Sequence, residues 1–172
     1  METTIQTYGI PDTIRAKYFA EIAHAGQEYN EDVPYTFHLQ QVVGVLTKFQ
    51  HTHPVLLCSG WLHDTLEDTA RSFKDIQARF GVEVAETVFC VTNELGRNRK
   101  ERAVKTYPKI KGNEWACRVK LADRIANVEY GLITKSKQLG MYKQEHAEFK
   151  KGIQHEGKHQ DMWKFLDTLL GL

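Results

Sequence analysis

Residues 61 to 68 read Trp-Leu-His-Asp-Thr-Leu-Glu-Asp, and this short stretch predicts both a helical protein and its chemistry. Its apolar start leads into two overlapping pairs of ionisable residues, each four apart and therefore stacked on neighbouring turns of a helix. The pairs are His63 with Glu67 and Asp64 with Asp68. Burying such a cluster on a mostly apolar segment is costly unless a partner compensates its charges. A divalent cation suits histidine and carboxylates, so the stretch predicts part of a metal site.

Two other segments offer a lone histidine or aspartate in an apolar, helix-like setting. His38 opens an amphipathic pattern that continues through Val42 and Leu46. Asp123 lies within Leu-Ala-Asp-Arg-Ile-Ala, and Asn127 follows one helical turn later. Mn²⁺, Fe²⁺, Co²⁺ and Zn²⁺ all accept a mixed set of nitrogen and oxygen ligands, and the sequence does not choose among them. The expected ligands, drawn from three helices, are His38, His63, Asp64 and Asp123.

Hydrophobic periodicity predicts helices throughout the chain, and no alternating strand pattern of useful length competes with them. Ser72 with Asp75 three residues later resembles a capping box, and Gly81 is expected to end the helix that this box begins. The fold class that follows is an all-α bundle. Prolines 34, 54 and 108 are expected in loops. The helical patterns cover residues 14–23, 42–46, 55–62, 76–80, 82–91, 115–133 and 160–170.

Composition agrees with a compact enzyme that forms one domain over residues 1–172. The chain is 41% hydrophobic and 26% charged, and a chain of this length buries roughly 70% of its unfolded surface. No stretch approaches the length of an apolar membrane span, and the start has no basic and apolar leader pattern. Three unpatterned cysteines fit a reducing cytoplasm. We therefore expect a cytoplasmic protein with neither a membrane nor a nucleic acid polymer as partner, whose oligomeric state the sequence leaves open.

Several short motifs follow one another in a recognisable order. They are Ala23-His24-Ala25-Gly26-Gln27, Pro34-Tyr35 with His38, His63-Asp64-Thr65-Leu66-Glu67-Asp68-Thr69, Phe80-Gly81, Val91-Thr92, and Lys120-Leu121-Ala122-Asp123-Arg124 with Asn127. From about residue 16 to about 150 this order resembles the HD superfamily of metal-dependent phosphohydrolases. More narrowly, it is similar to the hydrolase domain of RelA/SpoT proteins and to the small alarmone hydrolases.

The resemblance implies an HD-type helical bundle with a metal site between helices, on which the C-terminal helix packs. Members of that family remove pyrophosphate from the 3′ position of guanosine tetraphosphate or pentaphosphate in a Mn²⁺-dependent reaction, and some small members act as NADPH phosphatases. A bound divalent ion lowers the pKa of a coordinated water from 15.7 towards roughly 7, which supplies the nucleophile. Glu67 and Asp68 are then expected to orient that water and move its proton, and Asn127 to contact a substrate oxygen or the ribose.

A cluster of cations precedes the Asp123 segment. The stretch from residue 97 to 111 carries seven lysines and arginines, opposed only by Glu101. Its place between two expected ligand segments favours a phosphate-binding wall beside the metal, although a solvated surface would have the same composition. The side chains expected to contact substrate phosphates are Arg99, Arg102, Lys105 and Lys109.

One segment departs from the alarmone hydrolases. They usually carry an Arg-Lys pair after the Gly-Gln motif to hold the guanine ring and the phosphates. Here the segment from Gln27 to Asp32 has no cation, and Tyr29 is expected to stack on the base in place of the arginine. Two alternatives therefore stay open. The first is an HD phosphohydrolase or nucleotidase for another nucleotide, such as a dNTP, ppApp or NADPH. The second is a non-catalytic antitoxin or regulatory binding protein.

A second histidine pattern lies near the C-terminal end of the sequence. Residues 155 to 159 read His-Glu-Gly-Lys-His, which fits the His-Glu-x-x-His pattern of zinc peptidases. A glycine inside the pattern and few apolar neighbours argue against the buried helix that such a site requires. We interpret the segment as a loop.

Overall fold

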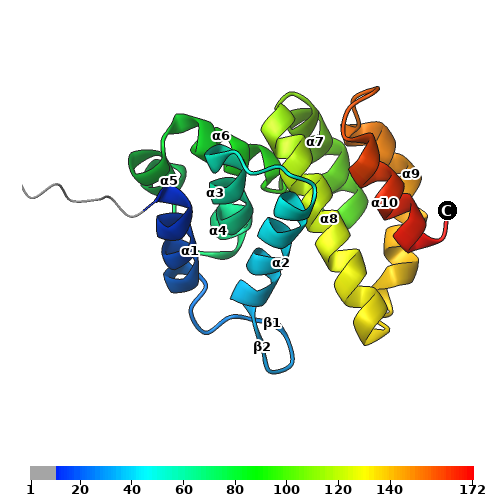
Figure 1. Cartoon of the computed structure of the whole chain (residues 1–172), viewed down its shortest axis with the longest axis horizontal. Helices are drawn as coiled ribbons and strands as arrows, with labels where there is room; N and C mark the ends of the chain where they lie inside the picture. Colours follow the sequence, from blue (N-terminus) through cyan, green and yellow to red (C-terminus); the bar gives the residue numbers. More distant parts are fainter. Residues whose placement is uncertain (1–10) are drawn as a thin grey trace, which may run out of the picture.

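The computed structural model describes residues 11–172, and helices dominate this part of the chain (Figure 1). The predicted all-α class is confirmed. None of the helices in the described range combines the length and the apolar character needed to cross a bilayer. The helices are α1 (Asp12–Ala23), α2 (Tyr35–Lys48), α3 (Pro54–Leu62), α4 (Thr65–Asp68), α5 (Phe73–Phe80), α6 (Val82–Val91), α7 (Arg99–Lys111), α8 (Glu114–Thr134), α9 (Gln138–Ile153) and α10 (Gln160–Leu170).

The packing centres on two helices far apart in the sequence. α2 and α8 pack against each other across the middle of the molecule, with α1, α3, α5 and α6 to one side and α9 and α10 to the other (Figure 1). Fully buried residues of both helices, such as Leu46 and Ile125, form the main core with Phe149 of α9 and Met162 of α10. The C-terminal helix therefore packs on the core, as the spacing of its apolar residues predicts.

A second core fills the space under α1. Ala16 and Ala20 of α1 face Leu39 of α2, Leu62 of α3 and Ile76 of α5, and all five side chains are fully buried. Since α2 contributes to both cores, it joins the two halves of the bundle. The N-terminal end of α2 is where His38 lies.

Local sequence signals set several helix ends. The Ser72 hydroxyl accepts from the Asp75 amide, and the Asp75 carboxylate accepts from the Ser72 amide at 2.8 Å, so the predicted capping box is confirmed. Gly81 ends α5 with a φ of 87°, a backbone conformation that favours glycine. Pro54 begins α3, where a missing amide hydrogen costs nothing.

Three features differ from the sequence-based expectation. None of the three prolines expected in loops lies in one: Pro34 ends a short strand, Pro54 is the first residue of α3, and Pro108 lies inside α7. Neither α7 nor α9 has a counterpart among the predicted helices. A small antiparallel hairpin, β1 (Glu28–Asn30) and β2 (Val33–Pro34), precedes α2 and pairs Glu28 with Pro34 and Asn30 with Val33. Strands of three and two residues are too short to leave an alternating pattern in the sequence.

Candidate metal centre and adjoining cavity

The junction between α3 and α4 carries the first two residues of the candidate site. α3 ends at Leu62 and α4 begins at Thr65, so His63 and Asp64 lie between two helices. The predicted single helix with Glu67 stacked on His63 is therefore wrong. The Glu67 carboxylate instead accepts hydrogen bonds from the backbone and side-chain amides of Asn93, each at 3.0 Å. His63 and Asp64 keep right-handed helical backbone angles at this junction, with φ of −58° and −98°.

The second predicted pair does come together. The Tyr35 hydroxyl donates to Asp64 at 2.7 Å and lies 3.2 Å from an oxygen of Asp68. The side chain of Gln27 donates to the Asp68 carbonyl at 2.7 Å, while its oxygen lies 2.7 Å from Nδ1 of His24. The histidine of the Gly-Gln motif thus holds the segment before the hairpin against α4, which is a structural role.

The four expected metal ligands converge from α2, the α3–α4 junction and α8. Nε2 of His63 lies 2.9 Å from Asp64 Oδ2, and Nε2 of His38 lies 3.8 Å from the same oxygen. Asp123 Oδ1 is 3.2 Å from Nε2 of His38 and 3.9 Å from Nε2 of His63. One ligand atom each from His38, His63 and Asp64 lie within 4.8 Å of one another. Atoms this close can surround a single ion.

The hydrogen bonds of His63 favour an ion at the centre of this cluster. Its Nδ1 lies 2.9 Å from the Gly60 carbonyl, so this nitrogen carries a hydrogen and Nε2 is the ring nitrogen that faces the carboxylates. Nε2 is buried and has no hydrogen-bond partner among the described residues. A buried imidazole nitrogen beside two carboxylates fits a divalent cation, which takes the place of the proton.

Positive charge is strongly favoured at this place. Burial opposes the charged form of His63, but Asp64 and Asp123 raise its pKa to about 9. Burial likewise opposes ionisation of Asp64, yet the neighbouring His63 holds its pKa well below the usual range. The pKa of Asp123 is also lowered, because the Lys120 ammonium and the two histidines outweigh its burial. The carboxylates therefore remain ionised, as metal ligands must be.

Lys120 is a residue that the sequence-based interpretation did not single out. Its ammonium pairs with Asp123 Oδ2 at 2.9 Å and is largely buried. Burial lowers the pKa of Lys120, but Asp123 and Asp64 raise it further, so the side chain stays charged. The position three residues before Asp123 on the same helix could have identified it.

An aromatic layer from the hairpin covers one side of the cluster. The Tyr29 ring stacks on His38, with centroids 4.8 Å apart and planes 9° apart. Its hydroxyl donates to Asn127 Oδ1 at 2.8 Å, and Asn127 Nδ2 donates to Asp123 Oδ1 at 2.6 Å. Burial, with Tyr142 and Asp123 nearby, raises the pKa of Tyr29, so the hydroxyl keeps its hydrogen. In this structure Tyr29 supports two residues of the site.

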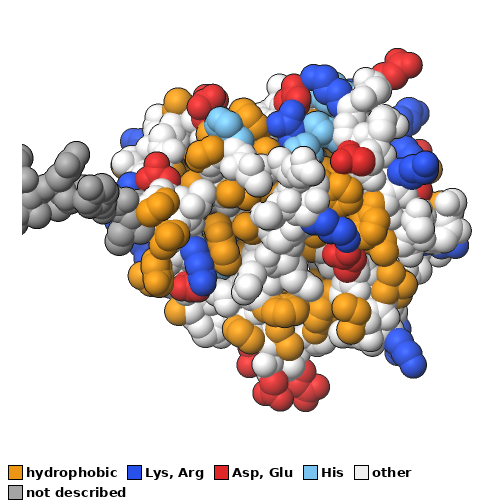
Figure 2. Space-filling view, viewed as in Figure 1, with side chains coloured by type: hydrophobic (Ala, Val, Ile, Leu, Met, Phe, Trp, Pro, Cys, Tyr) orange, Lys and Arg blue, Asp and Glu red, His pale blue; other side chains and the backbone are white. Residues whose placement is uncertain are grey.

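The acidic residues of the hairpin point away from the cluster. Glu28, Glu31 and Asp32 are exposed, and acidic side chains gather at the edge of the molecule where Figure 1 shows the hairpin (Figure 2). None of the three lines the cavity described next.

A cavity of about 620 Å³ lies beside Asp123 and Asn127. Its walls come mainly from α7, α8 and α9. Arg99 and Arg102 of α7 line it, and Lys120 and Arg124 of α8 add two cations that the sequence-based interpretation did not include. A nucleotide is of a size that such a cavity accommodates.

The expected basic wall is only partly present. Lys105 does not line the cavity; it pairs with Glu101 at 3.0 Å and donates to a backbone carbonyl. Lys109 does not line it either, since it pairs with Glu94 at 2.5 Å and donates to the Thr92 carbonyl at 3.0 Å. Lys105 and Lys109 lie farther along α7 than Arg99 and Arg102, and these carboxylates and carbonyls engage their ammonium groups. The basic wall is therefore corrected to Arg99 and Arg102 near the start of α7, joined by Lys120 and Arg124 of α8.

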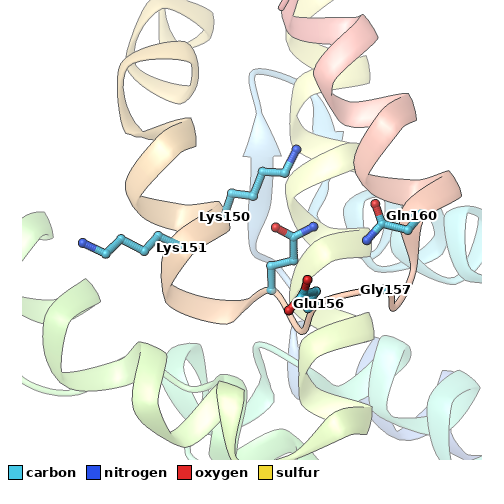
Figure 3. Close-up of a pocket in the computed structure, with 6 residues that line it drawn as sticks. Lys150, Lys151, Glu156, Gly157 and Gln160 are labelled. Atoms are coloured by element: carbon cyan, nitrogen blue, oxygen red, sulfur yellow. The ribbon is translucent and has the colours of Figure 1, made fainter.

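A second hollow lies at the loop between α9 and α10, and its volume is about 540 Å³. Lys150 and Lys151 extend from the end of α9, Gln160 begins α10, and Glu156 and Gly157 lie between them (Figure 3). None of the residues that line this hollow belongs to the metal cluster. It contains part of the His-Glu-x-x-His sequence, which forms a loop as predicted.

Comparison with known proteins places this geometry in a family. The sequence pattern of the HD domain matches residues 16–148. A guanosine-3′,5′-bis(diphosphate) 3′-pyrophosphohydrolase of Spiroplasma citri is 32% identical over 122 residues, 67% of this chain and 16% of that protein. The bifunctional (p)ppGpp synthase/hydrolase SpoT of Escherichia coli K12 is 34% identical over 135 residues, 72% of this chain and 19% of that protein. The chain therefore spans less than a fifth of the length of these relatives.

Solved structures show the same fold. A structure described as a metazoan ortholog of SpoT that hydrolyses ppGpp superposes with a TM-score of 0.80 at 22% identity, covering 96% of this chain and 97% of that one. The lmo0812 protein of Listeria monocytogenes has a TM-score of 0.62 at 22% identity, covering 78% and 99%. An HD domain implies a divalent metal, and the histidine and aspartate cluster provides a place for one. Fold, motifs and sequence similarity agree that this chain belongs to the HD-domain family and is homologous to the RelA/SpoT hydrolases.

Proposed function

We propose that this chain is a cytoplasmic, metal-dependent phosphohydrolase, formed by a single HD domain, that removes the 3′-diphosphate from guanosine 3′,5′-bis(diphosphate) and similar nucleotides. Mn²⁺ is the proposed ion. The observation that carries the proposal is the convergence of His38, His63, Asp64 and Asp123 beside a cavity lined by cations. The names of the relatives at 32–34% identity support the substrate class.

The four clustered residues are proposed to hold the ion. When bound, a divalent cation supplies Lewis-acid polarisation of a phosphoryl oxygen and makes water more acidic. His63 is oriented for this role by Gly60, and Asp64 by the Tyr35 hydroxyl. Such supporting hydrogen bonds fix the direction of a ligand and its protonation state.

Asp68 and Glu67 are proposed to handle the proton of the attacking water. Burial, followed by the charges of Asp64 and Glu67, raises the pKa of Asp68. A carboxyl group with a raised pKa takes up and returns a proton more readily near neutral pH. The backbone and side-chain amides of Asn93, which lines the cavity, both donate to Glu67 and fix its carboxylate.

The remaining expected substrate contacts divide into two groups. Arg99 and Arg102 are proposed to contact phosphates, because both line the cavity next to Asp123. Asn127 also lines it, but its amide nitrogen is directed at Asp123 and its oxygen accepts from Tyr29. We therefore propose that Tyr29 positions His38 and Asn127 instead of stacking on a base.

Another nucleotide substrate is the second candidate. The hairpin has no cation where alarmone hydrolases usually hold the guanine ring, and the Tyr29 ring is engaged with His38. This arrangement favours a substrate recognised through its phosphates, such as ppApp, NADPH or a dNTP. A non-catalytic binding protein is disfavoured, because the acidic residues Glu67 and Asp68 remain at the site.

The test is hydrolysis of a nucleotide panel by purified, metal-depleted protein with and without added Mn²⁺. We expect pyrophosphate from ppGpp and pppGpp only when Mn²⁺ is present. Asp64→Ala and Asp123→Ala should abolish turnover and keep the helical circular dichroism signal, while Asp161→Asn, an exposed substitution on α10, should change neither. Mn²⁺ should also raise the melting temperature of the parent protein and not of Asp64→Ala, because a ligand stabilises only the state that binds it.

The outcomes of this test distinguish the proposed function from its alternatives. Phosphate released from NADPH, or triphosphate from a dNTP, with ppGpp untouched would favour the second candidate. Undiminished turnover in Asp64→Ala would refute the site. Mn²⁺ binding without turnover of any nucleotide would favour a binding protein.

A further inference from the structure

Glu145 of α9 holds two of the cations that line the cavity. One carboxylate oxygen of Glu145 accepts from Arg99 Nε at 2.7 Å. The other lies 3.6 Å from Arg124 Nη2. The two arginines come from α7 and α8, and all three side chains line the same cavity. A carboxylate that reaches two guanidinium groups occupies a place where the phosphate of a ligand could lie.

Arg124 is unusual among the cations of the cavity, because it is 6% exposed. Its guanidinium carbon lies 4.2 Å from the ring centre of Phe149 and 4.8 Å from that of Tyr142. Burial lowers the pKa of Arg124, which indicates that its charge is incompletely compensated. Its Nη1 is buried and has no hydrogen-bond partner among the described residues. A buried donor without a partner is costly, so its presence at a cavity wall points to a ligand.

We propose that Arg99 and Arg124 form a second anion-binding position that takes the 5′-phosphates of the nucleotide, and that Glu145 occupies it until a ligand displaces it. This inference rests on the proposed function, which makes the ligand a phosphorylated nucleotide with its 3′ end at the metal cluster. The metal cluster serves the 3′ end of such a ligand, so a second position in the same cavity serves the other end.

The chemistry of the position favours phosphate. Guanidinium groups present planar forks of N–H donors that match phosphate oxygens, and the fork of Arg124 has an unused donor. Arg102 and Lys100 add positive charge to the same cavity. A ligand group with a single negative charge gains little, because it makes the same kind of contact with the arginines as the Glu145 carboxylate that it displaces. A diphosphate or triphosphate brings more charge and more acceptor oxygens than Glu145 provides.

Glu145 therefore acts as a selectivity residue. It competes only with ligands that place a charged group between Arg99 and Arg124, and highly phosphorylated nucleotides gain enough from the two arginines to displace it. A protein without this carboxylate would bind its phosphorylated ligands more tightly.

The test compares Glu145→Gln with Glu148→Gln in binding experiments that need no hydrolysis. Glu148 lines the same cavity, and its carboxylate makes no hydrogen bond or ion pair with another described residue, so it controls for the general loss of negative charge. Dissociation constants for guanosine, GMP, GDP and GTP are measured by calorimetry, with Mn²⁺ present and after chelation. Melting temperatures verify that both variants fold.

We expect the affinity of the parent protein to rise with each added phosphate. Glu145→Gln should tighten GDP and GTP binding by about fivefold, the value of one partly exposed ion pair, and leave guanosine within about twofold. Arg99→Gln, a partly exposed change that should fold, is expected to weaken GDP binding and to remove the difference between GDP and GMP.

Two results would overturn the inference. One is unchanged GDP affinity in Glu145→Gln. The other is an equal gain in Glu148→Gln, which would indicate general electrostatics. Failure of the proposed function looks different, because graded 5′-phosphate binding would then persist in a protein that releases no pyrophosphate from ppGpp.

Discussion

Substitutions of Tyr29 can test its hydrogen bond to Asn127 separately from the stacking of its ring on His38. Tyr29→Phe removes the hydroxyl that donates to Asn127 at 2.8 Å and keeps the ring that stacks on His38. Tyr29→Leu removes both. Each change therefore tests one contact between the hairpin and the metal cluster.

The contacts set the expected magnitudes. Loss of one hydrogen bond in a half-buried place costs about 1 kcal/mol, which lowers the melting temperature of a chain of this size by about 2 to 4 °C. Loss of the ring stack on His38 adds about 1 kcal/mol. Asn127 is less firmly held without the Tyr29 hydroxyl, so kcat should fall about fivefold in Tyr29→Phe and further in Tyr29→Leu.

Steady-state kinetics and thermal unfolding are the assays, with a double-mutant cycle as the sharper measurement. Tyr29→Phe and Asn127→Ala should couple by about 1 kcal/mol, because each removes the same hydrogen bond. If Tyr29 instead stacks on a nucleobase, Tyr29→Leu raises KM and leaves kcat and the melting temperature nearly unchanged. That pattern, or a coupling energy near zero, would refute the positioning role.

Two further predictions concern stability. Burial, with Arg118 and His51 nearby, lowers the pKa of His159 from 6.5 to about 4. The unfolded chain therefore binds this proton more readily, and the free energy of unfolding should decline as pH falls from about 6.5 to about 4. Because His159 is partly exposed, its contribution to this change in the free energy of unfolding is reduced to about 1 kcal/mol. His159→Asn, which tolerates the φ of 53° there, should remove that share in urea unfolding at several pH values, and an unchanged slope would contradict this. A methyl group on Gly152 of α9 would lie 2.3 Å from the Tyr107 ring, so Gly152→Ala should cost about 1 to 3 kcal/mol. Gly140→Ala in the same helix meets nothing within 4 Å and should be neutral or stabilising, and equal melting temperatures for the two variants would disprove the clash.

The parts of the fold that follow from local physics could be predicted from the sequence. The Ser72 capping box and Gly81 define α5 without reference to the rest of the chain. The sequence did not predict α9, because two of its four buried residues are Tyr142 and His146, whose polar groups weaken the apolar periodicity of the segment. Its burial pattern nevertheless follows the helical repeat, so a search that admits tyrosine and histidine would find it.

In the candidate site, too, features set by local sequence could be predicted and features set by contacts between distant segments could not. Ordered motifs identified the residues that converge on the cluster, because each motif lies on a helix whose packing fixes it. Which α7 cations face the cavity could not be read from local charge alone, since Arg99 and Lys109 pair with acidic residues distant in sequence. Glu145 lies 46 residues after Arg99 and holds it at 2.7 Å. A run of like charges does not reveal counter-ions that the tertiary fold supplies.

α8 has a geometric consequence for substrate choice. Lys120, Asp123, Arg124 and Asn127 all lie on this one helix and all line the cavity. A helix rises about 1.5 Å per residue, so these groups span roughly 10 Å along a rigid axis. No loop movement can bring them closer together or farther apart. The backbone spacing of these groups is therefore fixed, and we expect the distance between the charged groups of a ligand to influence how well it binds.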